Sequence, residues 1–336
     1  MRSPPAGLEP ERLAAALAEG WRLQAASMEY VPEGAGSYHW KLTDADGLPH
    51  FVTVDDLDDK DWFGHLRESV FDGLRCALST AAALRDEAGL PFVVAPLPAR
   101  DGEPLRRVDG RYTVSVFPFL AGRSRPFGAY SDRELREQAL DMIAALHQAT
   151  AAVGNRAPRH VPSYGGRDDL EAFLGDPERP WHGGPYSEAA HQLMMPRSAD
   201  LARLANGFDR LADSTATARA RLVITHGEPH QANLMAVDGR LMLIDWDTVA
   251  MAPPERDVSQ IAAADNKGID RYQQATGREL DPAILTLYRL RWYLDDLGSA
   301  MHMFRRCHSD TADTRRWLDG MAPWLDQLPG WLDRLS

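Results

Sequence analysis

The sequence predicts an α+β protein with two lobes, a small N-terminal lobe built on an antiparallel sheet (residues 1–119) and a larger helical lobe (residues 120–336). Two patterns indicate this division. Between residues 28 and 58, the β-prone runs "SYHWKLT" and "FVTV" flank the turn cluster "DADG", which is typical of an antiparallel meander. After residue 131, apolar residues recur mostly at helical spacing. We place the boundary near residues 118–122, where Pro118 and Gly122 interrupt a strand.

The elements of the first lobe follow from local patterns. Residues 9–20 are expected to form a helix, because Leu13 and Leu17 have helical spacing, Pro10 suits the first turn and Gly20 suits the stop. The meander comes next. Residues 66–88 return to a helical period, and the runs "FVVAPLPA" and "RYTVSVFPFL" predict two more strands.

The second lobe is predicted to open with a helix capped by Ser131, with Glu134 three residues later as its capping-box partner. Residues 151–192 are rich in Gly, Pro, His and aromatic residues and have no clean period, so a long irregular segment with short helices is expected there. Helical spacing resumes over residues 282–335.

Charge and hydropathy limit the classes of partner. The chain has 37 Lys and Arg against 49 Asp and Glu, and a net charge of -12 would repel nucleic acid and anionic membranes. The N-terminus lacks the apolar segment of a signal peptide, and no run approaches the roughly 20 apolar residues of a membrane span. We therefore expect a cytoplasmic protein without nucleic-acid or membrane partners. Cys76 and Cys307 lack the spacing of a metal site and are expected to be free thiols.

The stretch "VITHGEPHQANLMAVDGRLMLIDWD" (residues 223–247) concentrates polar side chains between apolar runs. His226 and His230 raise the alternative of a zinc site on one helix face. Gly227 and Pro229 lie between them, however, and a proline inside a helix removes a hydrogen bond. The zinc-protease pattern also requires a glutamate directly after the first histidine. The pattern therefore does not favour zinc.

The same stretch predicts a hairpin, because two strand-like runs flank an Asp-Gly turn signal. Such a hairpin brings Glu228, Asn233 and Asp245 to neighbouring loop ends. Phosphoryl transfer requires a carboxylate that accepts a hydroxyl proton and oxygen ligands for Mg²⁺. The alternative is a hairpin whose acids are merely solvated, and that reading would suffice for one acid but not for this combination.

These motifs resemble those of the aminoglycoside phosphotransferase family, antibiotic kinases with a protein-kinase-like fold, and especially its spectinomycin and streptomycete antibiotic phosphotransferases. In "ITHGEPHQAN" and "LIDWD" the resemblance implies that Glu228 is the catalytic base and that Asn233 and Asp245 bind Mg²⁺. It implies ATP or GTP as the phosphoryl donor. It gives structural roles to His226, His230 and Asp257.

The resemblance also implies a nucleotide site. The turn "PEGAGSYHW" would cover the phosphates, although alone it is as typical of an ordinary hairpin connection, and "VFPFLAG" would meet the adenine. The nucleotide-binding residues implied in this way are Gly34, Gly36, Ser37, Lys41, Thr53, Phe117, Phe119 and Leu120.

Two positions depart from the family pattern. Glu228 stands where the family usually has aspartate, and Thr53 stands where its phosphate-binding lysine is expected. Lys41, Lys60 or an arginine remains open as the replacement. These departures motivate a rival hypothesis, a nucleotide-binding pseudokinase that regulates a partner. A kinase for a small metabolite such as choline, homoserine or a sugar is a third hypothesis.

The acceptor implied by the resemblance is a small hydroxylated molecule, an antibiotic of aminoglycoside or aminocyclitol type, whose phosphorylation gives resistance. The acidic composition suits a cationic acceptor. We expect Asp295 and Asp296 on a late helix and Trp181 in the irregular segment to lie on the substrate side. The alternatives are a solvated acid pair and an aromatic residue packed under a loop.

Overall fold

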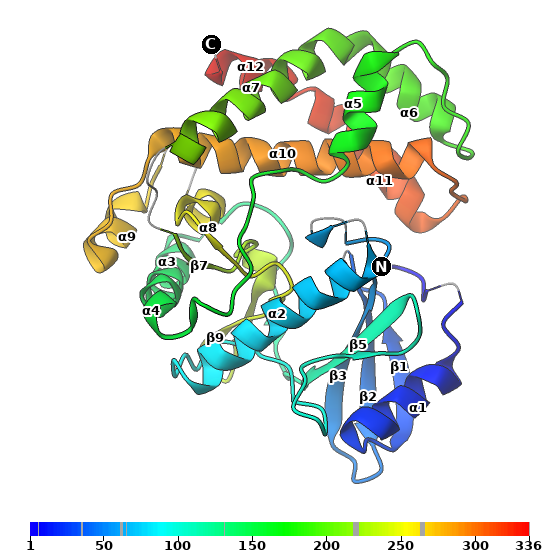
Figure 1. The fold of residues 1–336 in the computed structure, drawn as a ribbon, viewed down its shortest axis with the longest axis vertical. Coiled ribbons are helices and arrows are strands. Elements are labelled where there is room, and N and C mark those ends of the chain that lie inside the picture. Colours follow the sequence, from blue (N-terminus) through cyan, green and yellow to red (C-terminus); the bar gives the residue numbers. More distant parts are fainter. Residues whose placement is uncertain are drawn as a thin grey trace. The chain divides into compact units, whose positions relative to one another are not determined.

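The computed structural model describes residues 1–336 except 6, 35, 61, 62, 65, 131, 218–221, 263–265 and 336. Contacts divide the chain into two compact units (Figure 1), and we describe each unit separately. Unit 1 comprises Met1–His160 and Arg221–Leu280, and unit 2 comprises Val161–Ala220 and Asp281–Ser336. The lobe boundary expected near residue 119 lies inside unit 1, so the division at 119 and 120 stays a prediction.

Unit 1 contains a five-stranded antiparallel sheet, which confirms the α+β class and the expected meander. Its strands, in sheet order, are β1 (Ala25–Val31), β2 (Tyr38–Asp44), β3 (Pro49–Asp56), β5 (Tyr112–Pro118) and β4 (Arg106–Arg107). Helix α1 (Pro10–Trp21) covers one face of this sheet. Leu13 and Leu17 of α1 pack there against the apolar face, whose buried residues are Leu42, Val52, Val54, Val114 and Val116.

The opposite face of the sheet is mixed in character. Because directly paired residues point to the same face, the register groups His39 with Thr53 and Lys41 with Phe51 on this face. Phe117 pairs with Phe51 and packs against the apolar cluster that includes α2 (Arg67–Asp86). The face expected to meet the nucleotide therefore combines polar side chains near β2 and β3 with an apolar border at α2.

One local prediction is wrong, and another concerns a residue outside the described ranges. The run "FVVAPLPA" is not a strand. Its only ladder contact among the described residues is an isolated parallel bridge from Val93 to Leu243. The physical reason is that Pro96 and Pro98 carry no N–H to donate to a neighbouring strand. Helix α3 (Arg133–Gln148) is capped by Asp132, which accepts from two backbone N–H groups, whereas the expected cap Ser131 lies outside the described residues.

The remainder of unit 1 carries the motif of residues 223–247. Two small sheets are present, one pairing β7 (Val223–Thr225) with β10 (Ala250–Ala252), the other ordered β6 (Arg123–Ser124), β8 (Leu234–Val237) and β9 (Arg240–Leu243). The helical elements are α4 (Thr150–Val153), the 3-10 helix η3 (Gln231–Asn233), α8 (Glu255–Ile261) and α9 (Ile269–Thr276). Strands β8 and β9 form the predicted hairpin, and both turn residues, Asp238 and Gly239, have positive φ.

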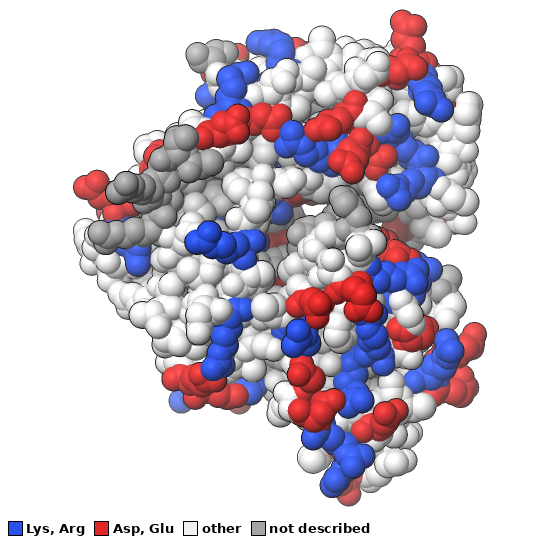
Figure 2. Space-filling model, viewed as in Figure 1, with Lys and Arg blue, Asp and Glu red and all other residues white. Residues whose placement is uncertain are grey.

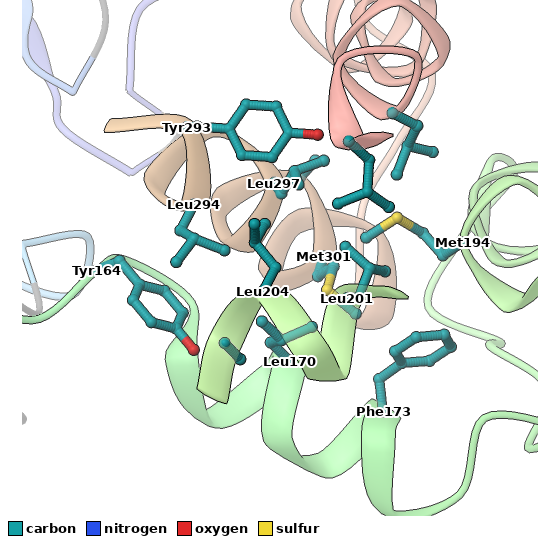
Figure 3. Close-up of a cluster of buried hydrophobic side chains, with 14 of the residues drawn as sticks. Tyr164, Leu170, Phe173, Met194, Leu201, Leu204, Tyr293, Leu294, Leu297 and Met301 are labelled. Atoms are coloured by element: carbon teal, nitrogen blue, oxygen red, sulfur yellow. The ribbon is translucent and has the colours of Figure 1, made fainter. Parts of the chain in front are cut away.

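Unit 2 is helical in the part of the chain that the structure describes. Its helices are α5 (Arg167–Gly175), α6 (Ser187–Met194), the 3-10 helix η2 (Met195–Arg197), α7 (Ser198–Thr217), α10 (Pro282–Arg305), α11 (Ala312–Leu325) and α12 (Leu328–Arg334). This arrangement confirms the short helices expected before residue 192 and the helical tail. Side chains from α5, α7 and α10 converge in one apolar core, shown in Figure 3 by Leu170, Phe173, Leu201, Leu204, Leu294, Leu297 and Met301.

Surface and length properties add two observations. On the face shown in Figure 2, acidic and basic side chains alternate over the surface and are not gathered by sign. Within the described ranges, every helix is too short or too polar to cross a membrane.

Candidate active site

Residues 226–230, which we call the 226–230 loop, connect β7 to η3, and all of their carbonyl groups are hydrogen-bonded. Each of the five carbonyl oxygens accepts a hydrogen bond. In chain order the donors are Thr248 Oγ1 (2.8 Å), Gln260 Nε2 (2.7 Å), Asn233 Nδ2 (2.9 Å), Tyr130 OH (2.6 Å) and the Asn233 backbone N (2.9 Å). A backbone held at every carbonyl leaves little freedom to the side chain that the loop presents.

Asp257, on α8, binds the backbone of the first two residues of this loop. Its carboxylate accepts the N–H of His226 at 2.8 Å and the N–H of Gly227 at 2.7 Å, and the imidazole of His147 lies 3.1 Å away. Asp257 is completely buried. Burial by itself opposes ionisation, but the hydrogen bond and charge of His147 outweigh it and lower the pKa of Asp257. The expected structural role of Asp257 is thus consistent with its contacts.

His226 orients the next part of the loop. Its Nδ1 lies 3.2 Å from the N–H of Glu228, which can only donate, so Nδ1 accepts. The proton then resides on Nε2, which donates to the carbonyl oxygen of Ile244 at 2.9 Å. Burial lowers the pKa of His226 to about 4, so the ring is neutral at physiological pH. Both ring nitrogens are engaged in orienting the backbone, as a structural role requires.

Gly227 is required by its surroundings. Its φ is +101°, and a Cβ at this position would lie 2.4 Å from Nη2 of Arg256. That guanidinium is held in place, since it donates to Thr225 Oγ1 at 2.8 Å and to the carbonyl oxygen of Thr248 at 3.0 Å. The glycine of the motif therefore serves close packing of the loop on Arg256.

The side chain that this loop presents is Glu228. It is 32% exposed, and its Oε2 lies 3.9 Å from Nε2 of His230. Burial lowers the pKa of His230 to about 4, with a smaller contribution from His226, so His230 is neutral beside the carboxylate. The ring of Phe127 meets His230 edge to face at 4.9 Å between centroids. Glu228 is therefore an accessible carboxylate on a rigid backbone.

The hairpin brings the two proposed metal ligands together. Leu234 pairs with Leu243, and the N–H of Ile244 donates to the carbonyl oxygen of Asn233 at 3.0 Å. Asn233 directly precedes β8, and Asp245 follows β9 by two residues, with a positive φ of 68°. The side-chain nitrogen of Asn233 donates a hydrogen bond to the carbonyl oxygen of Glu228. The remaining side-chain acceptor of Asn233 is its amide oxygen.

Negative charge accumulates at this end of the hairpin. Loss of hydration among the surrounding protein atoms, followed by the charges of Asp247 and Glu228, raises the pKa of Asp245, although the residue keeps an exposed surface. Burial opposes ionisation of Asp247 too, but the ammonium group of Lys60 lowers the pKa of Asp247. Carboxylates crowded in this way favour a bound cation.

Lys60 is the basic side chain in contact with this acidic group. Its ammonium group lies 2.6 Å from Oδ2 of Asp247, 3.0 Å from Oδ1 of Asp55 and 3.2 Å from Oγ of Ser37. The Ser37 hydroxyl donates to Asp55 at 2.6 Å. Lys60 is 1% exposed. These contacts connect the glycine-rich turn to the residues that follow β3 and β9.

The other predicted nucleotide residues lie along β2, β3 and the segment after β5. Gly34 and Gly36 have φ of +78° and +83°, and a Cβ on Gly34 would approach the His39 ring at 3.1 Å. His39 also contacts Thr53, at 3.3 Å between Nδ1 and Oγ1. Lys41 lies over the ring of Phe119 at 5.0 Å. Phe117, Phe119 and Leu120 are half-buried.

The donor set fits Mg²⁺ better than zinc. Mg²⁺ takes oxygen ligands, commonly one or two carboxylates, and completes its shell with water and substrate phosphates. Asn233 and Asp245 offer an amide oxygen and a carboxylate of that kind. Within the described ranges, no cluster of three or more His, Cys, Asp and Glu residues is arranged to bind a metal without such additional ligands.

The expected substrate residues lie in unit 2. Asp295 accepts the N–H of Gly165 at 2.6 Å and lies 3.2 Å from Arg291. Burial, followed by the charge of Asp295, raises the pKa of Asp296 to about 7. Trp181 is 6% exposed and packs against Phe173 in the core of the unit, which agrees with the alternative interpretation of packing under a loop.

Sequence reasoning missed three residues that hold the 226–230 loop: Tyr130, Thr248 and Gln260. Thr248 directly follows the motif "LIDWD" and could have been identified from the sequence. Tyr130 and Gln260 carry no local signal, because each acts only through a contact with a loop that is distant in sequence.

The chain is similar in sequence to known proteins. The sequence profile described as the phosphotransferase enzyme family matches residues 74–295. Protein StrN of Streptomyces griseus is 28% identical over 241 residues, covering 68% of this chain and 70% of that protein.

Solved structures with a similar fold include a spectinomycin phosphotransferase in complex with ADP and spectinomycin. It has a TM-score of 0.69 and 15% identity, over 98% of this chain and 99% of that chain. An amicoumacin kinase in complex with AMP-PNP and Ca²⁺ has a TM-score of 0.59 and 14% identity, over 97% and 94% of the two chains. At these identities the likeness shows the fold.

Proposed function

This chain belongs to the phosphotransferase enzyme family, and from that premise we propose that it transfers the terminal phosphoryl group of ATP or GTP to a hydroxyl group of a small molecule. The observation that carries the proposal is the 226–230 loop. Its backbone is hydrogen-bonded at every carbonyl, and it presents the accessible Glu228 carboxylate next to Asn233 and Asp245. Positioning and electrostatic stabilisation account for most of the catalysis of phosphoryl transfer, and a rigid loop of this kind serves both.

Glu228 is the proposed catalytic base. Its carboxylate accepts the proton of the acceptor hydroxyl while the hydroxyl oxygen forms a bond to the γ-phosphorus. The bond between that phosphorus and the bridging oxygen breaks, and the nucleoside diphosphate leaves. His230 beside Glu228 is neutral at neutral pH, since its pKa is about 4, so it carries no charge that would pair with the Glu228 carboxylate. Glutamate serves here as aspartate would, because the two have similar reference pKa values.

Asn233 and Asp245 are the proposed ligands of Mg²⁺. When bound, this ion neutralises charge on the nucleotide phosphates. The crowding of Asp245 with Asp247 and Glu228 supports this assignment. Loss of hydration, followed by the negative charges of Asp247 and Glu228, raises the pKa of Asp245, and a divalent cation would offset those charges.

The proposed acceptor is an antibiotic of the aminoglycoside or aminocyclitol type, so that phosphorylation gives resistance. The support is twofold: a solved structure of similar fold was obtained with spectinomycin, and the net charge of -12 suits a cationic molecule. We place the reaction in the cytoplasm, where nucleoside triphosphates are supplied.

A transfer assay tests the proposal. Wild-type protein is incubated with ATP or GTP, Mg²⁺ and a panel of acceptors containing spectinomycin, other aminocyclitols, macrolides, choline, homoserine and sugars. Release of nucleoside diphosphate and a mass gain of one phosphoryl group on one acceptor class are expected. Glu228→Gln should lower kcat by roughly 10²–10⁴-fold, the range for loss of a general base, with little change in nucleotide affinity.

The outcomes separate the competing hypotheses. Transfer only to choline, homoserine or a sugar would show that the acceptor is a metabolite and not an antibiotic. The proposed phosphoryl transfer to a hydroxyl group would still hold. Nucleotide binding without transfer to any acceptor, together with no effect of Glu228→Gln on background hydrolysis, would refute the proposed activity. That result would favour the pseudokinase that regulates a partner.

A further inference from the structure

Phosphate binding at this site requires positive charge that the strand position does not supply. Thr53 lies on β3 where a charged residue was expected, and its hydroxyl contacts the ring of His39. Burial lowers the pKa of His39 to about 4, so that ring is neutral. The surroundings meanwhile contain the carboxylates of Asp55, Asp247 and Asp245. A polyphosphate entering this region meets excess negative charge unless a side chain compensates for it.

The three lysines of the sequence differ in how well they are placed to bind the nucleotide phosphates. Lys41 packs over the ring of Phe119, beyond the end of β5. Lys267 is exposed and follows α8. Lys60 contacts Ser37, the first residue after the glycine-rich turn, and Asp247, two residues beyond the proposed metal ligand. Among the arginines, Arg256 lies near the 226–230 loop but is committed to Thr225 and Thr248.

From this geometry we propose that Lys60, which follows β3 in the sequence, binds the phosphates of the nucleotide in place of the residue at position 53. This inference rests on the proposed function and names a further residue of the same site. Two carboxylates, Asp55 near the end of β3 and Asp247 after β9, hold the Lys60 ammonium next to Ser37 at the glycine-rich turn.

The contacts also indicate how Lys60 makes room for a phosphate oxygen. An ammonium group has three protons to donate, and the Lys60 nitrogen lies 2.6 to 3.2 Å from oxygen atoms of Asp55, Asp247 and Ser37. The hydroxyl of Ser37 is the neutral and most distant of these partners, at 3.2 Å, and it keeps its own bond to Asp55 when released. A phosphate oxygen therefore takes the place of Ser37, and the two carboxylates retain Lys60.

Lys60 is ready for this role before the nucleotide binds. Burial alone would lower the pKa of Lys60, but the charges of Asp247 and Asp55 outweigh it and raise the pKa. The lysine is therefore charged throughout the physiological range and needs no protonation step.

The first experiment measures phosphate-dependent affinity. Binding of ATP, ADP, AMP and adenosine is determined by calorimetry, with Mg²⁺, for wild type, Lys60→Gln and the exposed control Lys267→Gln. Lys60→Gln should weaken ATP binding by about tenfold to a hundredfold, the effect of losing a charge-assisted hydrogen bond, and should leave adenosine binding unchanged. Lys267→Gln should bind every ligand as wild type does.

A second variant separates the phosphate role from a purely structural one. In Thr53→Lys/Lys60→Gln, the positive charge moves to the strand position, and recovery of ATP affinity is expected. A purely structural Lys60 would instead weaken the binding of all four ligands alike, and Thr53→Lys would not restore it. That pattern would overturn the inference.

A third measurement covers the case in which Lys60→Gln does not fold. Wild-type protein is crystallised with Mg²⁺ and AMP-PNP. An Nζ atom of Lys60 within hydrogen-bond distance of a phosphate oxygen supports the inference, and a Lys60 that contacts only Asp55, Asp247 and Ser37 overturns it. If wild type transfers phosphate while Lys60→Gln binds ATP normally, only this inference fails. If wild type binds no nucleotide, the proposed function fails as well.

Discussion

Replacement of Asp257 by asparagine is the sharpest test of how the 226–230 loop is held. The carboxylate accepts two backbone N–H groups, from His226 at 2.8 Å and from Gly227 at 2.7 Å, and it is completely buried. Asparagine keeps one acceptor oxygen and turns an NH₂ group toward the other donor. The variant therefore loses one charge-assisted bond and leaves a buried N–H group without an acceptor.

The magnitude follows from these two losses. A hydrogen bond to a charged group contributes about 1.5–3 kcal/mol, and an unsatisfied buried polar group costs about 1–3 kcal/mol. Together they predict a loss of roughly 3–5 kcal/mol, the same range as breaking a buried ion pair. Transfer activity should fall as well, because Glu228 directly follows the two residues whose N–H groups Asp257 holds.

Urea unfolding followed by circular dichroism measures the effect, with Asp141→Asn as the control. Asp141 is an aspartate of the same unit whose side chain is 48% exposed beside Arg271, so its replacement should leave the unfolding midpoint nearly unchanged. Equal stability of Asp257→Asn and wild type at pH 7, or a loss no larger than that of Asp141→Asn, would refute the reasoning.

The pH dependence gives a second readout of the same variant. The pKa of Asp257 is lower in the folded protein than its usual value near 3.9, so its ionised form contributes stability above that pH. This contribution is lost as the pH falls through the folded pKa. The difference in unfolding free energy between wild type and Asp257→Asn should therefore be full at pH 7 and narrow below about pH 4.

Two further predictions follow from the structure. Gly227→Ala should lower the free energy of unfolding by about 1–3 kcal/mol and should also lower kcat, because its Cβ would lie 2.4 Å from Arg256. The control is Gly102→Ala, since Gly102 has a φ of +85° and open space around it, so this variant measures the backbone strain alone. Equal shifts of the urea midpoint in the two variants would contradict the packing argument. Asp296→Asn should stabilise the protein at pH 8. The raised pKa of Asp296, about 7, keeps its proton bound in the folded state while the unfolded chain releases it near pH 4, so wild-type stability falls between those values. The expected gain in unfolding free energy is about 1–2 kcal/mol, because the partial exposure of Asp296 weakens the effect. Parallel curves of unfolding free energy against pH for the variant and the wild type would contradict this prediction.

Local sequence signals were sufficient for much of the fold. The hairpin of β8 and β9 was predictable because its alternating apolar residues and its Asp-Gly turn are adjacent in the chain. The same locality placed Asn233 and Asp245 together. Where local signals conflicted the prediction failed: "FVVAPLPA" has β-prone residues, but its prolines prevent a ladder.

The sequence by itself determined the helices expected at residues 9–20, 66–88 and 282–335 and the hairpin, and it indicated which acids stand at the hairpin's ends, since each of these depends on residues a few positions apart. Only the tertiary structure decided what surrounds them. Lys60 and Asp247 are 187 positions apart, and Tyr130 and Pro229 are 99 apart, yet each pair is in direct contact. Contacts over such separations depend on how the whole chain packs, and no local pattern encodes them.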